Sequence, residues 1–196
     1  MTQYNSDDDW GILIDGVTDV IVRGPGTIER FFWFGILVRG SSGVTLTRVT
    51  SQDNVESNVI AYDVTDLTLH DNRLLRGGYA SLDLRASSSR ILYNRITSSQ
   101  YGENTVYVEG GSTALEFRGN VVEGGYGVVV RASGNTFVGN TVTNTIGFSP
   151  GAVGNRVIEN VFGSIEDENG CGPNVYKGNW FTAAYPACLQ VPRVGR

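Results

Sequence analysis

The sequence predicts an all-β solenoid, in which the chain winds into about seven stacked coils of short parallel strands. Three observations predict it: a motif that repeats about every 20 residues, short β-branched segments between turn residues, and an excess of glycine. Glycine occupies 26 of the 196 positions, whereas proline occupies only 5. Tight turns at regular intervals explain this composition, and a collagen period does not.

The repeated motif is a six-residue pattern, apolar-x-x-Asn-x-apolar, which occurs six times. Its asparagines follow one another at spacings of 22, 26, 20, 20 and 19 residues, within the range of solenoid repeats. Coils that stack about 4.8 Å apart place equivalent residues directly above one another, so their buried amides can bond along the column. We therefore expect a structural ladder of Asn72, Asn94, Asn120, Asn140, Asn160 and Asn179.

The strands are expected upstream of these motifs, in short segments with apolar residues at alternate positions. A turn and a second β-branched run follow the early segments, as at residues 44–46. Segments of three to five residues separated by turns exclude helices as the main element. The first strands of six coils are expected at residues 11–15, 35–39, 59–63, 81–85, 105–109 and 127–131.

Two columns of side chains on these first strands are predicted to face outward. The column in the middle of the strand consists of Leu13, Leu37, Ala61, Asp83, Tyr107 and Val129. The column at the strand end alternates in charge and consists of Asp15, Arg39, Asp63, Arg85, Glu109 and Arg131. Opposite charges one rung apart attract, so the simplest interpretation of the second column is a surface ladder that helps to fix the register.

Several segments resemble the repeats of the pectate-lyase-like superfamily, among them residues 35–38 (GILV), 44–46 (VTL) and 139–142 (GNTV). Within that superfamily they are similar to NosD-like copper-maturation proteins of the periplasm and to alginate epimerase modules. The resemblance covers residues 10–182 and implies a single right-handed parallel β-helix. We expect an acidic tail at residues 1–9 before it and a C-terminal capping segment at residues 171–196.

The resemblance also suggests where chemistry would occur, because related carbohydrate enzymes place catalytic groups on this outer face. A uronate lyase needs an arginine beside the sugar carboxylate and a tyrosine or arginine to move the proton, and a hydrolase needs two carboxylates. The catalytic motifs of polygalacturonases and alginate epimerases are absent from the sequence. The predicted catalytic residues are Asp83, Tyr107, Arg85 and Arg131, and the predicted substrate-binding residues are Asp63, Glu109 and Trp33.

Trp33 is included because the aromatic run at residues 31–34 cannot point inward at every position, and flat rings stack on sugars. The expected partner is therefore a polysaccharide or oligosaccharide, which the protein binds or processes as a lyase or hydrolase. Two alternatives stay open. One is a non-enzymatic scaffold or maturation factor of the NosD-like kind, and the other is a structural repeat protein.

Charge and hydropathy argue against two other kinds of partner, nucleic acid and a membrane. The 15 basic residues against 20 acidic ones form no cluster, which argues against nucleic acid. No apolar run approaches the ~18 residues of a membrane span. No cofactor or metal site is predicted, except that the acidic run of Asp7, Asp8 and Asp9 is a candidate for weak calcium binding.

The two cysteines, Cys171 and Cys188, are predicted to form a disulfide that pins a C-terminal loop, with two free buried thiols as the alternative. A disulfide implies an oxidising compartment, so the protein is expected to be secreted or periplasmic, although residues 1–10 carry no signal peptide. Only polar residues precede the first strand. We expect either that the natural chain extends further upstream or that this N-terminal edge pairs with another chain.

Overall fold

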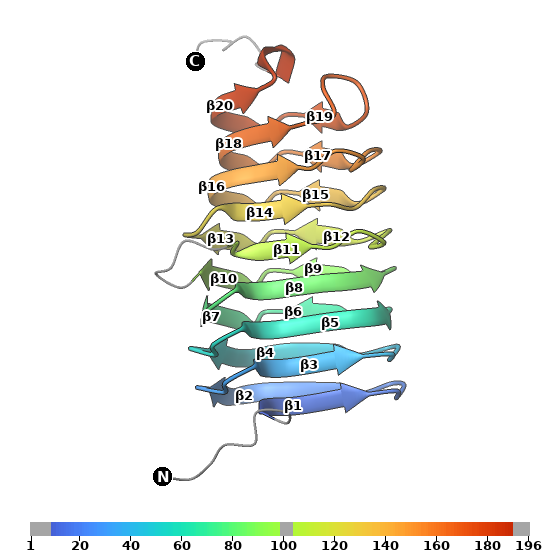
Figure 1. Cartoon of the computed structure of the whole chain (residues 1–196), viewed down its shortest axis with the longest axis vertical. Helices are drawn as coiled ribbons and strands as arrows, with labels where there is room; N and C mark the ends of the chain where they lie inside the picture. The colour runs from blue at the N-terminus through green and yellow to red at the C-terminus, as the bar shows by residue number, and fades with distance from the viewer. Residues whose placement is uncertain (1–8, 99–103, 190–196) are drawn as a thin grey trace.

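The computed structural model describes residues 9–98 and 104–189, and it is a stack of parallel coils (Figure 1). The stack has about eight turns, compared with the seven predicted. Strands of one coil pair in parallel with those of the next, as β1 does with β3. One 3-10 helix, η1 (Ala187–Leu189), is the only helical element within the described ranges. The prediction of an all-β solenoid is confirmed.

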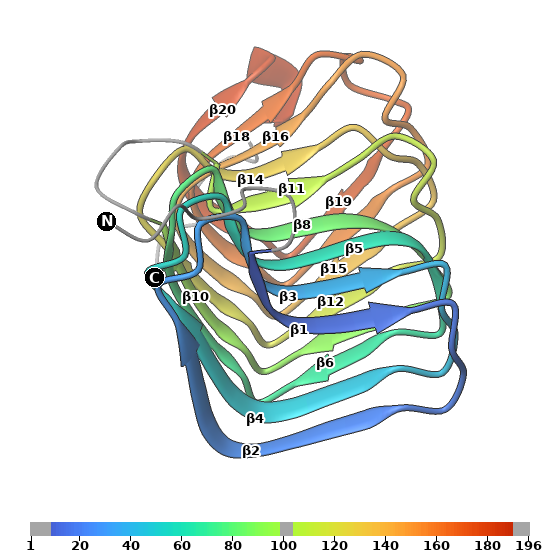
Figure 2. The ribbon, with the colours of Figure 1, turned by 60° about the horizontal axis from the view of Figure 1, so that its bottom comes forward.

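Each coil has three sides, which Figure 2 shows from nearer the end of the stack. Sheet 1 contains β1 (Trp10–Asp15), β3 (Phe34–Arg39), β5 (Ser57–Thr65), β8 (Ala80–Ser87), β11 (Val106–Val108) and β14 (Gly127–Val130). Sheet 2 contains β6 (Thr68–His70), β9 (Arg90–Leu92), β12 (Glu116–Arg118), β15 (Thr136–Val138), β17 (Arg156–Ile158) and β19 (Val175–Lys177). Sheet 3 contains β7 (Arg73–Gly77), β10 (Arg95–Ser98) and β13 (Val121–Glu123).

Five longer strands bend around a corner and belong to two sheets. β2 (Ile21–Glu29) and β4 (Thr45–Gln52) join sheets 2 and 3. β16 (Thr141–Phe148), β18 (Val161–Asp167) and β20 (Trp180–Tyr185) join sheets 3 and 1. Because β16 and β18 pass from one sheet to the next without a turn signal, the pattern of short separate strands undercounts the coils.

The inward side chains form one continuous apolar core along the stack. Aliphatic residues such as Leu82 and Leu84, both fully buried, fill the earlier coils. Aromatic rings enter further along, where Phe117 and Phe137 stack with centroids 4.9 Å apart and Phe148 meets Phe137 edge-on. Burying an apolar side chain of this size contributes about 1.5–3 kcal/mol, so the core dominates the stability of the fold.

The six asparagines of the repeated motif line up at the corner between sheets 2 and 3. Each side-chain amide donates to the Oδ1 atom of the asparagine in the next coil at 2.9–3.0 Å, from Asn72 through to Asn179. The same oxygen also accepts the backbone N–H of the preceding asparagine. The column therefore satisfies polar groups that the corner would otherwise bury without partners.

A second asparagine column lies at the corner between sheets 1 and 2, and the sequence analysis missed it. Its members are Asn135, Asn155 and Asn174, linked by bonds from each backbone N–H to the next Oδ1 at 2.8–2.9 Å. Each lies five positions before a member of the first column, and this regular offset is visible in the sequence. The column ends where the Asn174 amide donates to the buried Asp167 carboxylate at 2.9 Å.

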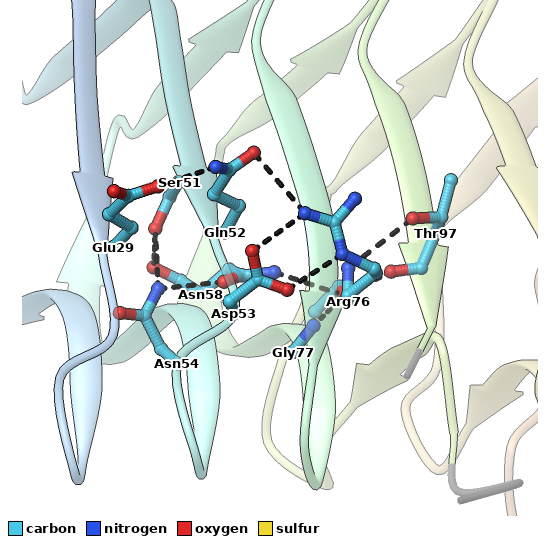
Figure 3. A network of polar contacts seen from close by, with 10 residues as sticks. Glu29, Ser51, Gln52, Asp53, Asn54, Asn58, Arg76, Gly77 and Thr97 are labelled. Carbon is cyan, nitrogen blue, oxygen red and sulfur yellow. Dashed lines mark hydrogen bonds and ion pairs between the residues drawn. The ribbon is translucent and has the colours of Figure 1, made fainter. Parts of the chain in front are cut away.

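The corner between sheets 3 and 1 has a local polar network in the early coils (Figure 3). The Asn54 amide donates to Asn58 Oδ1 at 2.7 Å, and the Asn58 amide donates to Ser81 Oγ at 3.2 Å. On the outside of the same corner, Arg76 holds Asp53 through two bonds of 2.6–2.7 Å. The buried amides have partners, so this network is a structural element of the corner.

The predicted outward columns are wrong at the third coil of sheet 1. Ile60 pairs with Leu37 and Asp83, whereas Ala61 is fully buried in the core. In the column at the strand end, the residue between Arg39 and Arg85 is Tyr62, whereas the prediction placed Asp63 there. Asp63 has a positive φ of 53° at a register shift, so one extra residue moves the pattern.

The C-terminal end of the described chain is closed by a disulfide and by η1. Cys171 and Cys188 are bonded to one another, with Cα atoms 6.0 Å apart. Leu189 is only 7% exposed and packs on the end of the core. No helix among the residues described here has the length and apolar character needed to cross a membrane.

Candidate functional site

The outer face of sheet 1 carries a buried carboxyl, that of Asp83. Its neighbours on β8, Leu82 and Leu84, point into the core, so the alternation of the strand directs Asp83 outward. It lies between Ile60 on β5 and Tyr107 on β11, its register partners one rung to either side. Asp83 is nevertheless only 3% exposed, which is unusual for an outward acidic residue.

The surroundings of Asp83 favour its protonated form. Burial, and next the negative charge of Glu109, raise the pKa of Asp83 from 3.8 to about 7, against a backbone hydrogen bond from Leu84 that lowers it. Its Oδ1 atom is buried and has no hydrogen-bond partner. Asp83 therefore exchanges its proton near neutral pH, the range in which a general acid or base works.

Asp167 shows what a purely structural buried carboxylate looks like in the same protein. It is 1% exposed, and its Oδ2 accepts the Asn174 amide at 2.9 Å and the Tyr176 hydroxyl at 2.7 Å. Its Oδ1 accepts the backbone and side-chain N–H groups of Asn169. Both oxygens of Asp167 are satisfied, whereas one oxygen of Asp83 is not, and the difference marks Asp83 as the candidate functional group.

Tyrosine rings and arginines surround Asp83. The Tyr79 and Tyr107 rings meet edge-on with centroids 6.4 Å apart. The Arg131 guanidinium lies 5.1 Å from the centre of the Tyr107 ring, and the Arg85 guanidinium lies 5.5 Å from the centre of the Tyr62 ring. Burial raises the pKa of Tyr107, although the charge of Arg131 opposes this effect, so its phenol stays protonated at neutral pH.

The structure brings together most of the predicted site residues. Asp83, Tyr107, Arg85 and Arg131 lie on three successive rungs of sheet 1, and Glu109 acts on the Asp83 pKa. Asp63 is held to Arg85 by an ion pair of 2.8 Å between Oδ2 and Nη2.

Trp33 does not belong to this group. It precedes β3, several coils before β11, and packs between Phe32 and Phe34, with ring centroids 5.3 and 6.3 Å away. A role in binding sugar for Trp33 would therefore need a separate subsite.

A cleft of about 340 Å³ opens on the same face, on the C-terminal side of Asp83. Gly147 holds the mid-strand position there, between Val129 and Glu166, and its lack of a side chain makes room for the Tyr126 ring. A Cβ atom at Gly147 would lie 3.1 Å from the Tyr126 hydroxyl oxygen, which itself donates to Glu166. The lining includes Tyr107, Tyr126, Arg131, Gly147, Glu166 and Glu168.

The sequence analysis missed Tyr62, Glu166 and Glu168 as neighbours of the site. Tyr62 was hidden by the register shift, and the two glutamates lie on the bent strand β18 or directly after it. The coil register, once the bent strands are recognised, is the signal that would have found them.

No group of three potential metal ligands occurs in the described parts of the chain. Of the acidic run proposed for calcium, Asp7 and Asp8 lie outside the described residues. The Asp9 carboxylate accepts the Phe32 backbone N–H at 2.8 Å.

Comparison with known proteins identifies the architecture. A family model described as a right handed beta helix region matches residues 5–144, which is well over half of the chain. A search of curated proteins finds no match.

Proposed function

The chain belongs to the right-handed β-helix family, and from this membership together with the site around Asp83 we propose that it cleaves glycosidic bonds of an acidic polysaccharide. The fold alone supports many activities, so the site must carry the argument. The observation that carries it is the buried Asp83 carboxyl, with an unpaired oxygen and a pKa of about 7, on a face lined by tyrosines and arginines.

Hydrolysis is the reaction that this pair of carboxyl groups supports best. Asp83 holds its proton to near neutral pH, while the charge of Glu109 contributes to the raised Asp83 pKa. Two carboxyl groups in unequal protonation states are the usual equipment of a glycosidase. Asp83 donates its proton to the glycosidic oxygen, water attacks the anomeric carbon, and Glu109 accepts the proton that the water releases.

Elimination is the second candidate, and the two arginines favour it. Arg85 and Arg131 lie on either side of the Glu109 rung, where a guanidinium can neutralise a uronate carboxylate. In that case the ionised form of Asp83 removes the proton from the carbon that bears the carboxylate. A carbon–carbon double bond forms as the C–O bond to the leaving sugar breaks, and the leaving oxygen takes up a proton from water.

The disulfide between Cys171 and Cys188 supports a location outside the cytoplasm. A secreted or periplasmic protein would meet polysaccharide there, which agrees with the proposed substrate class.

The test incubates the protein with polygalacturonate, alginate and glucuronan, and with glucuronoxylan and rhamnogalacturonan, whose uronates neighbour neutral sugars. It measures reducing ends and the ultraviolet absorbance of unsaturated sugars. Hydrolysis releases reducing ends without unsaturated product and slows as the pH rises through about 7, where Asp83 loses its proton. Elimination releases reducing ends together with unsaturated product, and its rate increases as the pH rises through about 7.

The Asp83→Asn substitution should lower either rate about 100-fold to 10,000-fold, the usual contribution of general acid–base catalysis. Asp66→Asn is the matched control, because Asp66 is exposed and far from the cleft lining. If no polymer is cleaved by the wild type, or if Asp83→Asn is fully active, the proposed cleavage is wrong. Binding of a polymer without cleavage would instead support the non-enzymatic scaffold.

A further inference from the structure

The cleft beside Asp83 changes in chemistry along its length. It runs over the rungs of β11, β14, β16 and β18, which corresponds to roughly 14 Å at the usual strand spacing. Arg131 lies at the end near Tyr107, and Glu166 and Glu168 lie at the other end. The charge along the cleft therefore changes from positive to negative with distance from Asp83.

The walls of the cleft suit the ring of a sugar. Tyr126, which is 38% exposed, supplies aromatic surface on which the apolar C–H face of a sugar packs. The Tyr126 hydroxyl donates to Glu166 and so fixes both groups in position. The volume of about 340 Å³ lies within the range of small-ligand sites.

The two glutamates also restrict which sugar fits. Carboxylates accept strong hydrogen bonds from hydroxyl groups, and they repel the carboxylate of a uronate. Gly147 leaves the room that the Tyr126 ring occupies at the wall of the cleft. Its backbone conformation is open to any residue, because its φ lies outside the left-handed region.

We propose that this cleft binds an uncharged sugar residue of the polysaccharide, next to the uronate that lies over Asp83. The inference rests on the proposed function for its substrate class, and it narrows that class to heteropolysaccharides in which neutral sugars neighbour uronates. Uniform polyuronates would place a carboxylate against Glu166 and Glu168.

The test measures binding to the full chain by calorimetry with mannotetraose, galactotetraose, xylotetraose and cellotetraose, and with tetragalacturonate for comparison. At least one neutral tetrasaccharide should bind with an affinity that added salt leaves unchanged. Gly147→Val pushes the Tyr126 ring away from its place at the cleft wall, and Glu168→Gln removes one charge. Each should weaken that binding about tenfold, the effect of losing one good charged hydrogen bond or contact.

The matched control is Gly26→Ala, since Gly26 is a strand glycine on another face with open space around its Cβ position. Gly147→Ala is the milder variant if the valine disturbs folding, which circular dichroism reports.

Three outcomes overturn the inference: no neutral tetrasaccharide binds, only tetragalacturonate binds, or both Gly147 variants bind as the wild type does. Cleavage of polyuronate without neutral-sugar binding overturns this inference and leaves the proposed cleavage standing. Neutral-sugar binding that the variants weaken, without cleavage of any polymer, keeps the cleft as a sugar site and refutes the cleavage.

Discussion

Replacing Asp83 by asparagine should change how the stability of the protein depends on pH. The Asp83 carboxyl loses its proton near pH 3.8 in the unfolded chain and near pH 7 in the folded protein. Between these values the folded state binds more protons than the unfolded state, so the free energy of unfolding falls as the pH rises. Stability from this group is fully present below pH 3.8 and is lost by about pH 7.

The size of the effect follows from the two pKa values of Asp83. Integrating the proton linkage from pH 5 to pH 8 gives a loss of about 2–3 kcal/mol in the free energy of unfolding. Other groups titrate over this range in both proteins, so the difference between wild type and Asp83→Asn isolates Asp83. The variant should lose about 2–3 kcal/mol less than the wild type over this range.

The assay is urea unfolding at pH 5 and pH 8, followed by far-ultraviolet circular dichroism. Asp66→Asn is again the control, because Asp66 is exposed at a positive φ of 53°, which asparagine adopts about as readily as aspartate. If wild type and Asp83→Asn show the same change between the two pH values, Asp83 is not a buried carboxyl of raised pKa, and the argument for the site fails.

Three further predictions concern the structural polar groups and the disulfide. Asn120→Ala should cost about 2–4 kcal/mol in urea unfolding, because it leaves several buried ladder groups unpaired. Asn179→Ala, at the end of the ladder, should cost clearly less, and equal costs would contradict the ladder as a cooperative column. Asp167→Ala should cost about 3–5 kcal/mol in the same assay, since it removes the carboxylate that accepts hydrogen bonds from the Asn174 amide and the Tyr176 hydroxyl. Reducing the bond between Cys171 and Cys188, 17 residues apart, should cost about 3 kcal/mol. Thermal melts with and without reductant measure this loss, and unchanged melting of the last coil would refute it.

The repeated asparagine motif predicted the fold because its physics is local and repeats. An amide at a buried corner needs a partner, and stacking supplies one from the next coil, as between Asn94 and Asn120. The second column, at Asn135, Asn155 and Asn174, obeys the same rule and was equally open to prediction from its spacing.

The site was harder to predict, for two physical reasons. Residues 59–63 are compatible with an alternating strand that turns either Ile60 or Ala61 outward. Only the left-handed conformation of Asp63 shows that Ile60 faces outward. The cleft is lined by residues of four rungs, and one wall depends on the room that Gly147 leaves for the Tyr126 ring. A composition rich in glycine gives no indication of which glycine makes room for a neighbouring ring.

The shared corner amides have a consequence for how such a protein lengthens over evolutionary time. A duplicated segment of about 20 residues, such as one running from Asn120 to Asn140, inserts a complete coil whose amide meets identical neighbours above and below. The sheets would keep their register, and residues on the outer face would move apart by one strand spacing. Gene duplication could thus add new surface to this protein without redesigning its interior.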